Sequence, residues 1–305
     1  MRIRYPMNTV DTWLMRPAPA TRLATLRILC AAYATIFLVA RLPSFWRGTT
    51  LPSSRLEGVG VLWFLDSRPS PGLMQALIVI VVLLGCMVTI GLRHRWTGPL
   101  FAIGFLIVST YRLSFGHVIH TEHLIAIYLL IIGFSSAADA RTIENRNPST
   151  GAHARYGTPV RLMVVVLVLT YVLAGWAKLR HGGMDWLFGD ILRNQVAYDN
   201  LRKELLGSPH SPLGGWLVRF GWLFPPAAIL TTLVELGAVV VLFGSRRWRW
   251  IWAVGAWAFH VGVLATMAIS FPLPLSFVAY APLFAVEHLS MMRLRRRSAN
   301  NEVHA

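Results

Sequence analysis

Long runs of hydrophobic residues, separated by short polar and basic segments, dominate this chain. Each run is about 18 residues or longer, which is the length that an α-helix needs to cross ~30 Å of hydrocarbon. The apolar residues within a run are continuous rather than alternating with polar ones, and this favours helices over strands. The sequence therefore predicts an all-α, polytopic transmembrane bundle of about eight helices. The expected spans are residues 22–41, 73–92, 98–114, 121–137, 161–179, 225–243, 250–269 and 274–289.

The composition agrees with this pattern. Of the 305 residues, 55% are hydrophobic and only 14% are charged, whereas roughly a quarter of the residues of a soluble domain are charged. A sizeable water-soluble domain is therefore excluded. The last expected span contains Pro274 and Pro282, so we expect a kink there. The segment before the first span is polar and basic and lacks a cleavage site of small residues, so the first helix is expected to act as its own insertion signal.

The arginines indicate the orientation of the spans. The positive-inside rule places short loops rich in Lys and Arg on the cytoplasmic side, and the turns 115–120 and 270–273 contain neither residue. Both termini are therefore expected in the cytoplasm, with the protein in the cell membrane. The formal net charge of +16 is expected to meet anionic lipid rather than nucleic acid. The expected parts are a cytoplasmic N-terminal segment (1–21), a transmembrane domain (22–290) with an amphipathic outer-face segment (184–224), and a basic cytoplasmic tail (291–305).

Lysine is rare in this chain, which makes Lys178 informative. Of the 29 Lys and Arg residues, only Lys178 and Lys203 are lysines, so arginine serves almost everywhere that a positive charge merely orients or solubilises the chain. Lys178 lies at the outer end of the fifth expected span. Arginine stays protonated in proteins, whereas a partly buried lysine can lose its proton and act as a base. A lysine that snorkels to the headgroups is the alternative interpretation.

A group of histidines lies at the outer end of the fourth expected span, on the same side of the membrane as Lys178. It comprises His117, His120, Glu122 and His123. On a helix, His120 and His123 would share a face. Because ionisable groups are expensive in lipid, such a group at membrane depth indicates a functional interior.

Two further ionisable residues and the two cysteines lie inside expected spans. His260 and Glu235 are both near the middle of a helix, where Glu235 needs a buried partner, and we expect Arg112 or His260 to be that partner. Cys30 and Cys86 are expected to pack as small apolar residues. Neither a disulfide nor a metal site is predicted.

Three stretches resemble the vitamin K-dependent gamma-carboxylase family, in the part shared with bacterial horizontally transferred transmembrane (HTTM) domain proteins. They are AGWAKL-x5-DW-x2-G (174–189), HTEHLIAIYLLIIGFSSAADA (120–140) and FHVGVLATMAISFP (259–272). The resemblance covers about residues 15–290, and the order, spacing and helix placement of the stretches agree together.

The resemblance implies an activity at the outer face. In gamma-carboxylases, a lysine of the AG-x2-KL stretch deprotonates the hydroquinone of vitamin K. Oxygen then adds, the resulting alkoxide removes a proton from a peptide glutamate, carbon dioxide captures the carbanion, and the quinone leaves as its epoxide. Lys178 matches that base, His123 matches a histidine that supports oxygenation, and His260 matches the histidine that opens the FH-x10-FP stretch.

The resemblance also implies the ligands. Reduced vitamin K or menaquinol, with O2 and CO2, would be the cofactors, and a quinol and a secreted peptide would be partners beside the lipid bilayer. Candidates for the quinone pocket are His117, His120, Glu122, Trp176, Asp185, Trp186 and Glu235. The lysine pair of the family is Ala177–Lys178 here, and the large extramembrane domain of the animal enzymes is not matched. Two alternatives therefore stay open: a non-redox factor for maturation or export of a secreted peptide, and a haem- or quinone-binding electron carrier.

Overall fold

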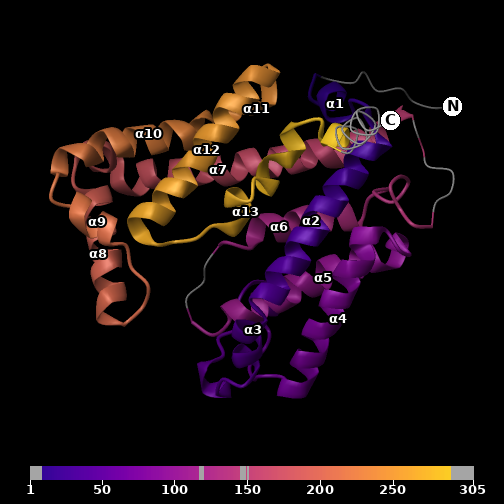
Figure 1. The fold of residues 1–305 in the computed structure, drawn as a ribbon, viewed down its shortest axis with the longest axis horizontal. Coiled ribbons are helices and arrows are strands. Elements are labelled where there is room, and N and C mark those ends of the chain that lie inside the picture. Colours follow the sequence, from indigo (N-terminus) through magenta and orange to yellow (C-terminus); the bar gives the residue numbers. More distant parts are fainter. Residues whose placement is uncertain (1–8, 117–119, 145–148, 150, 290–305) are drawn as a thin grey trace, which may run out of the picture. The chain divides into compact units, whose positions relative to one another are not determined.

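The fold is all-α, as predicted. A computed structural model describes residues 9–116, 120–144, 149 and 151–289, and 76% of the structure is helix (Figure 1). The only strands among these residues are β1 (Ala18–Pro19) and β2 (Ala152–His153), which pair antiparallel with Ala18 opposite His153.

The helices fall into two compact units, residues 1–163 with 284–305 and residues 164–283. The first unit contains α1 (Thr9–Leu14), α2 (Ala20–Ala40), α3 (Leu42–Thr49), η1 (Ser53–Arg55), η2 (Gly60–Leu62), α4 (Pro71–Ile90), α5 (His94–Leu113), α6 (His123–Gly133) and η6 (Val286–His288). Helix α7 (Ala154–Phe188) begins in the first unit and ends in the second. The second unit continues with α8 (Ile191–Leu205), α9 (Pro212–Leu217), η3 (Gly221–Leu223), α10 (Phe224–Leu236), η4 (Gly237–Val239), α11 (Val240–Phe243), α12 (Arg246–Met267), α13 (Pro272–Leu275) and η5 (Val278–Leu283).

Five helical segments of the described chain are long and apolar enough to cross a membrane. They are α2, α4, α7, the joined helices over Gly221–Phe243, and α12. Each contains most of one expected span, because a continuous apolar run satisfies its backbone hydrogen bonds within a single helix. The structure therefore supports a multi-pass membrane protein. The position of the termini and the identity of the membrane stay predictions.

The three other expected spans are not among these five segments. Helix α6 has only 11 residues and is about 16 Å long at 1.5 Å per residue, which is short of the hydrocarbon thickness. Helix α5 has 20 residues but does not reach the hydropathy of a spanning helix. The prediction of one helix over 274–289 is wrong. Pro274 and Pro282 lie in a region that forms α13, η5 and η6 instead, because proline removes a helical hydrogen bond and clashes with the preceding turn.

Arginines hold α2 in place within the first unit. Arg22 donates from Nε and Nη2 to the carboxylate of Glu287, at 2.9 and 2.7 Å. Arg27 is fully buried and donates to the backbone carbonyls of Ala137 and Arg141, at 2.9 and 2.6 Å. A buried guanidinium needs such partners, since leaving its donors unpaired would be costly. These bonds tie α2 to segments more than 100 residues away in the sequence.

In the second unit, α12 packs against α8, α9, α10, α11 and α13, and α10 packs against α8. Part of this arrangement is visible in Figure 1. The candidate site lies among these helices and the second half of α7.

Candidate functional site

Helices α7 and α10 approach each other closely at Gly175. A Cβ atom on this residue would lie 2.9 Å from the Cβ of Glu235 and 3.1 Å from the side chain of Leu236, so a larger residue would push the helices apart. Lys178 lies three residues further along α7, on the same face. Its Nζ forms a hydrogen bond and an ion pair with Oε1 of Glu235. In the AG-x2-K stretch, the glycine therefore lets α10 approach α7 closely, and the lysine forms an ion pair with a residue of α10.

The ion pair lies in an apolar and aromatic environment. The side chain of Glu235 is 3% exposed and that of Lys178 is 25% exposed. Nζ of Lys178 lies 5.4 Å from the ring centres of both Trp186 and Phe259, within the range of cation–π attraction. Trp186 is itself fixed, because its Nε1 donates to Oγ1 of Thr232 at 3.0 Å. The ammonium group therefore has one carboxylate and two aromatic neighbours.

A break in α7 positions Trp186. Gly183 has φ 55° and ψ −139° inside the helix, a conformation that is accessible to glycine and strained for other residues. The chain changes direction there, and Trp186, three residues later, is buried over Lys178. The conformation of Gly183 thus places Trp186 as one wall of the site.

Lys178 also lines an apolar cavity of about 480 Å³ between α7, α8, α9, α10 and α12. It is the only charged residue of the lining, and the polar residues beside it are Gln195, Thr231 and Thr266. The other lining residues are Trp186, Leu192, Val196, Leu217, Leu223, Phe224, Ala227, Leu230, Val234, Gly255, Ala258, Phe259, Gly262, Val263 and Met267. The volume and the mostly apolar lining are in the usual range of cavities that bind small organic molecules.

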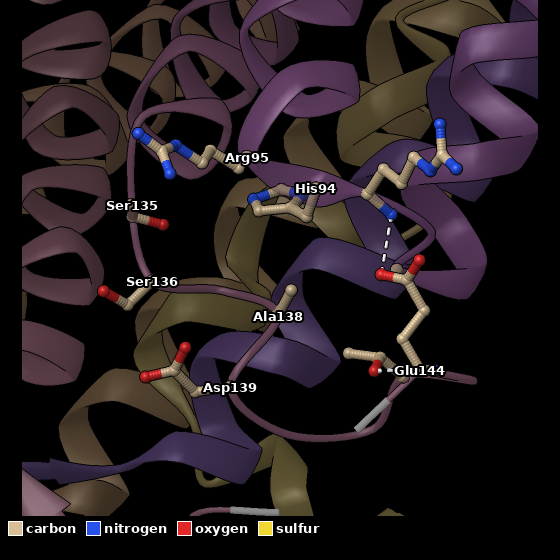
Figure 2. A pocket seen from close by; sticks show the side chains of 10 residues that line it. His94, Arg95, Ser135, Ser136, Ala138, Asp139 and Glu144 are labelled. Carbon is tan, nitrogen blue, oxygen red and sulfur yellow. Dashed lines mark hydrogen bonds between the residues drawn. The ribbon is translucent and has the colours of Figure 1, made fainter. Parts of the chain in front are cut away.

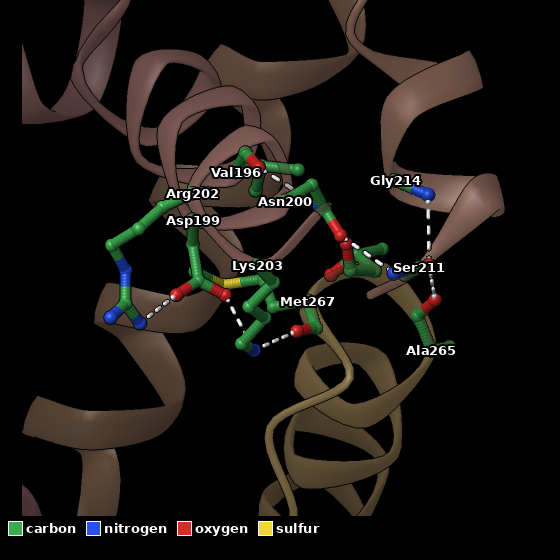
Figure 3. Close-up of polar contacts among 10 residues, drawn as sticks. Val196, Asp199, Asn200, Arg202, Lys203, Ser211, Gly214, Ala265 and Met267 are labelled. Carbon is green, nitrogen blue, oxygen red and sulfur yellow. Dashed lines mark hydrogen bonds and ion pairs between the residues drawn. The ribbon is translucent and has the colours of Figure 1, made fainter. Parts of the chain in front are cut away.

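Side chains of α8 and of the start of α9 cap the C-terminal end of α12 (Figure 3). The last carbonyls of a helix have no partner within the helix, and those of α12 accept from the side chains of Ser211, Asn200 and Lys203. Lys203 donates to the carbonyl of Met267 and also pairs with Asp199 at 2.7 Å. The second lysine of the chain therefore serves to cap α12, whereas Lys178 lines the cavity.

His260 lies outside the cavity lining, although its neighbour Phe259 is part of it. Its Nε2 is 2.9 Å from the hydroxyl of Tyr171, which is 2.8 Å from the hydroxyl of Tyr280. All three side chains are buried. The prediction that His260 is the partner of Glu235 is wrong, because the imidazole hydrogen-bonds to this tyrosine pair.

The candidates of the fourth expected span lie in the first unit. Glu122 is buried and pairs with Arg112, so the prediction that Arg112 pairs with Glu235 is also wrong. His120 and His123 are exposed, and their ring centres are 5.9 Å apart. His117 lies outside the described residues. A joint role for this group and Lys178 stays a prediction.

The remaining candidates come from the AGWAKL-x5-DW stretch. Trp176 and Asp185 are exposed and do not line the cavity, whereas Trp186 lines it. Sequence reasoning missed Phe259 and Thr232. The second had a recognisable signal, since Thr232 and Glu235 are polar residues three positions apart on a mostly apolar helix and therefore share a face.

A second, polar hollow of about 570 Å³ lies in the first unit, with His94 and Arg95 on one side and Asp139 and Glu144 on the other (Figure 2). Its acidic groups already have partners: Glu144 accepts from the backbone N–H of Arg93 at 2.8 Å, and Asp139 pairs with an arginine at 2.9 Å. Burial lowers the pKa of His94, which favours the neutral imidazole. The charges of the hollow are thus largely balanced, and no single ligand chemistry is favoured. Within the described residues, no three His, Cys, Asp or Glu side chains are grouped to hold a metal ion.

Comparison with known protein families, curated proteins and solved structures found no match to this chain. Membership of the gamma-carboxylase family therefore stays a prediction that depends on the three similar stretches.

Proposed function

We propose that this chain is a multi-pass membrane protein that binds an apolar quinol in the cavity of its second unit and uses Lys178 to take a proton from it. The observation that carries the proposal is the position of Lys178. It is the only charged residue lining an apolar cavity of about 480 Å³. A lysine whose role was to snorkel to the headgroups would not pair with a carboxylate that is 3% exposed.

The lining fits a quinol of the menaquinol or vitamin K type. Such a ligand has a flat aromatic head with hydroxyl groups and an apolar tail. Lys178 and Thr231 supply polar groups for the head, and Leu192, Leu223 and Val263 contribute apolar wall for the rest of the molecule. A cavity of this size is within the range of about 300–1,000 Å³ that holds small organic ligands.

The residues of the chain would orient the ligand and hold the proton. Trp186 and Phe259 present their rings to Nζ of Lys178, which keeps the nitrogen at one position beside the cavity. A base within hydrogen-bond reach of a hydroxyl can remove its proton. When bound, a reduced quinol would supply the oxygen chemistry implied by the resemblance to gamma-carboxylases.

The test is epoxide formation by purified protein in detergent, supplied with menaquinol and oxygen. Wild type should produce epoxide, and Lys178→Met should not, because it removes the base and retains an apolar side chain of similar length. Lys203→Arg is the matched control, since arginine retains a positive partner for Asp199 and a donor for the carbonyl of Met267. This variant should retain the activity.

Two results would contradict the proposal. Equal activity of Lys178→Met and wild type would remove Lys178 from the chemistry. Absence of both epoxide and bound quinol in folded wild type would reject the quinol site. A factor for maturation or export of a secreted peptide would then become the leading function.

A further inference from the structure

We infer that Glu235, acting through Lys178, is the final acceptor of the proton that the ligand loses. This inference rests on the proposed function, since it assigns a route to the proton of that site. It makes Glu235 a positioning and proton-holding residue that does not itself line the cavity.

The geometry arranges three groups in sequence. Lys178 lines the cavity, and its Nζ binds Oε1 of Glu235, which is not part of the lining. Among the described residues, Oε2 of Glu235 is buried and has no hydrogen-bond partner. No other titratable group is included in the lining that α8, α9, η3, α10 and α12 contribute to the cavity. A proton that leaves the ligand toward Lys178 therefore has one acceptor beyond it.

Charge balance in an apolar environment explains why the proton would go on to Glu235. In the resting pair, one ammonium neutralises one carboxylate. An ionised hydroxyl beside Lys178 would be a second anion, and two anions around one cation disfavour each other's ionisation. Glu235 is the more deeply buried group of the pair, so a charge there is the more costly to maintain. Trp186 and Phe259 continue to stabilise the ammonium when the carboxylate is neutral.

The transfer balances without any co-reactant. One N–H bond of Lys178 breaks and an O–H bond forms on Glu235. The O–H bond of the ligand then breaks and an N–H bond forms on Lys178. The site ends with an anionic ligand oxygen, an ammonium and a neutral carboxylic acid, and its net charge is the same as before.

The first test measures binding of 2-methyl-1-naphthol, whose anion has its own absorption band, as a function of pH. Wild type should bind it as the anion with a Kd that does not change with pH, because the proton stays in the site. In Glu235→Gln, Trp186 and Phe259 still hold Lys178 as the ammonium, so no base remains in the site. The proton of the naphthol must then leave to solvent, and the apparent Kd for total naphthol should fall tenfold for each unit that the pH rises toward the pKa of the naphthol. The control is Glu122→Gln, which alters a buried acid–arginine pair in the first unit and should behave like wild type. Equal slopes in wild type and Glu235→Gln would overturn the inference.

The second test needs only wild type, so it does not depend on the folding of a variant. Infrared difference spectra with and without the naphthol should show the carbonyl stretch of a newly protonated carboxylic acid, and the band should shift in protein labelled with 13C-glutamate. Naphthol bound as the anion without this band would overturn the role of Glu235 and leave the quinol site standing. Naphthol that does not bind, or binds only in its neutral form, would reject the proposed function and the inference together.

Discussion

Replacing Gly175 by alanine tests whether the contact between α7 and α10 is as tight as the structure indicates. The added Cβ would lie 2.9 Å from the Cβ of Glu235, whereas carbon atoms in contact prefer about 3.5–4.0 Å. The helices must therefore separate by roughly 0.5–1 Å at the point where they hold Lys178 and Glu235 together. Overpacking of this kind costs about 1–3 kcal/mol, and alanine returns about 1 kcal/mol through its higher helix propensity.

The matched control for stability alone is Gly262→Ala in the second half of α12, where a Cβ would meet nothing within 4 Å and would face the cavity. This variant obtains only the helical gain of about 1 kcal/mol. Gly175→Ala should therefore be about 1–3 kcal/mol less stable than Gly262→Ala. At about 2–4 °C per kcal/mol, the two should differ by several degrees in Tm, measured by tryptophan fluorescence in detergent.

Gly175→Ala also tests the proposed function. Gly175→Ala should also weaken the pH-independent binding of the naphthol, since Nζ of Lys178 moves away from Glu235. If Gly175→Ala has the same Tm as Gly262→Ala, the close approach of the helices does not exist, and the explanation of the AG-x2-K spacing is wrong.

Three further predictions concern stability and use thermal unfolding in detergent. Lys178→Met should cost about 3–5 kcal/mol because it leaves the buried carboxylate of Glu235 unpaired, and adding Glu235→Leu should restore most of this loss; a double variant as unstable as the single one would contradict the pairing. Although burial opposes it, hydrogen bonds from Arg22 hold the pKa of Glu287 below its ordinary 4.5. This pair therefore stabilises fully above about pH 4.5 and is lost as the pH falls through the lowered pKa, so Glu287→Gln should flatten the acid side of a plot of Tm against pH. Ser211→Ala removes a cap from α12 and from α9 and should cost about 1–2 kcal/mol, whereas an unchanged Tm would show that water replaces the hydroxyl.

The sequence predicted the long helices well because their pattern is local. The apolar runs of α2, α4 and α12 are each sufficient to form a helix of spanning length. The short helix α6 could not be predicted from its run of apolar residues, because composition alone does not show that the helix ends at Gly133. The prolines near 274 and 282 were noticed, but whether proline kinks a helix or ends it depends on the neighbours that accept the freed backbone groups.

Part of the lining of the candidate site could be recognised in the sequence. The rarity of lysine identified Lys178, and the similar stretch around it included Trp186. The partner of Glu235 could not be predicted, since the choice among Lys178, Arg112 and His260 depends on which helices pack together. A single position on α12 illustrates the same limit: Phe259 lines the cavity and His260 does not, because neighbouring residues on a helix point about 100° apart.

The opposite charges of Lys178 and Glu235 have an electrical consequence. A unit charge that crosses a membrane gains or loses about 2.3 kcal/mol per 100 mV of potential, so a lone lysine that acquired or released its proton through the bilayer would be sensitive to the voltage across it. A proton that is exchanged within a neutral pair moves only a few ångströms and leaves the total charge of the site unchanged. The proton transfer proposed for this site should therefore proceed at the same rate in energised and de-energised membranes.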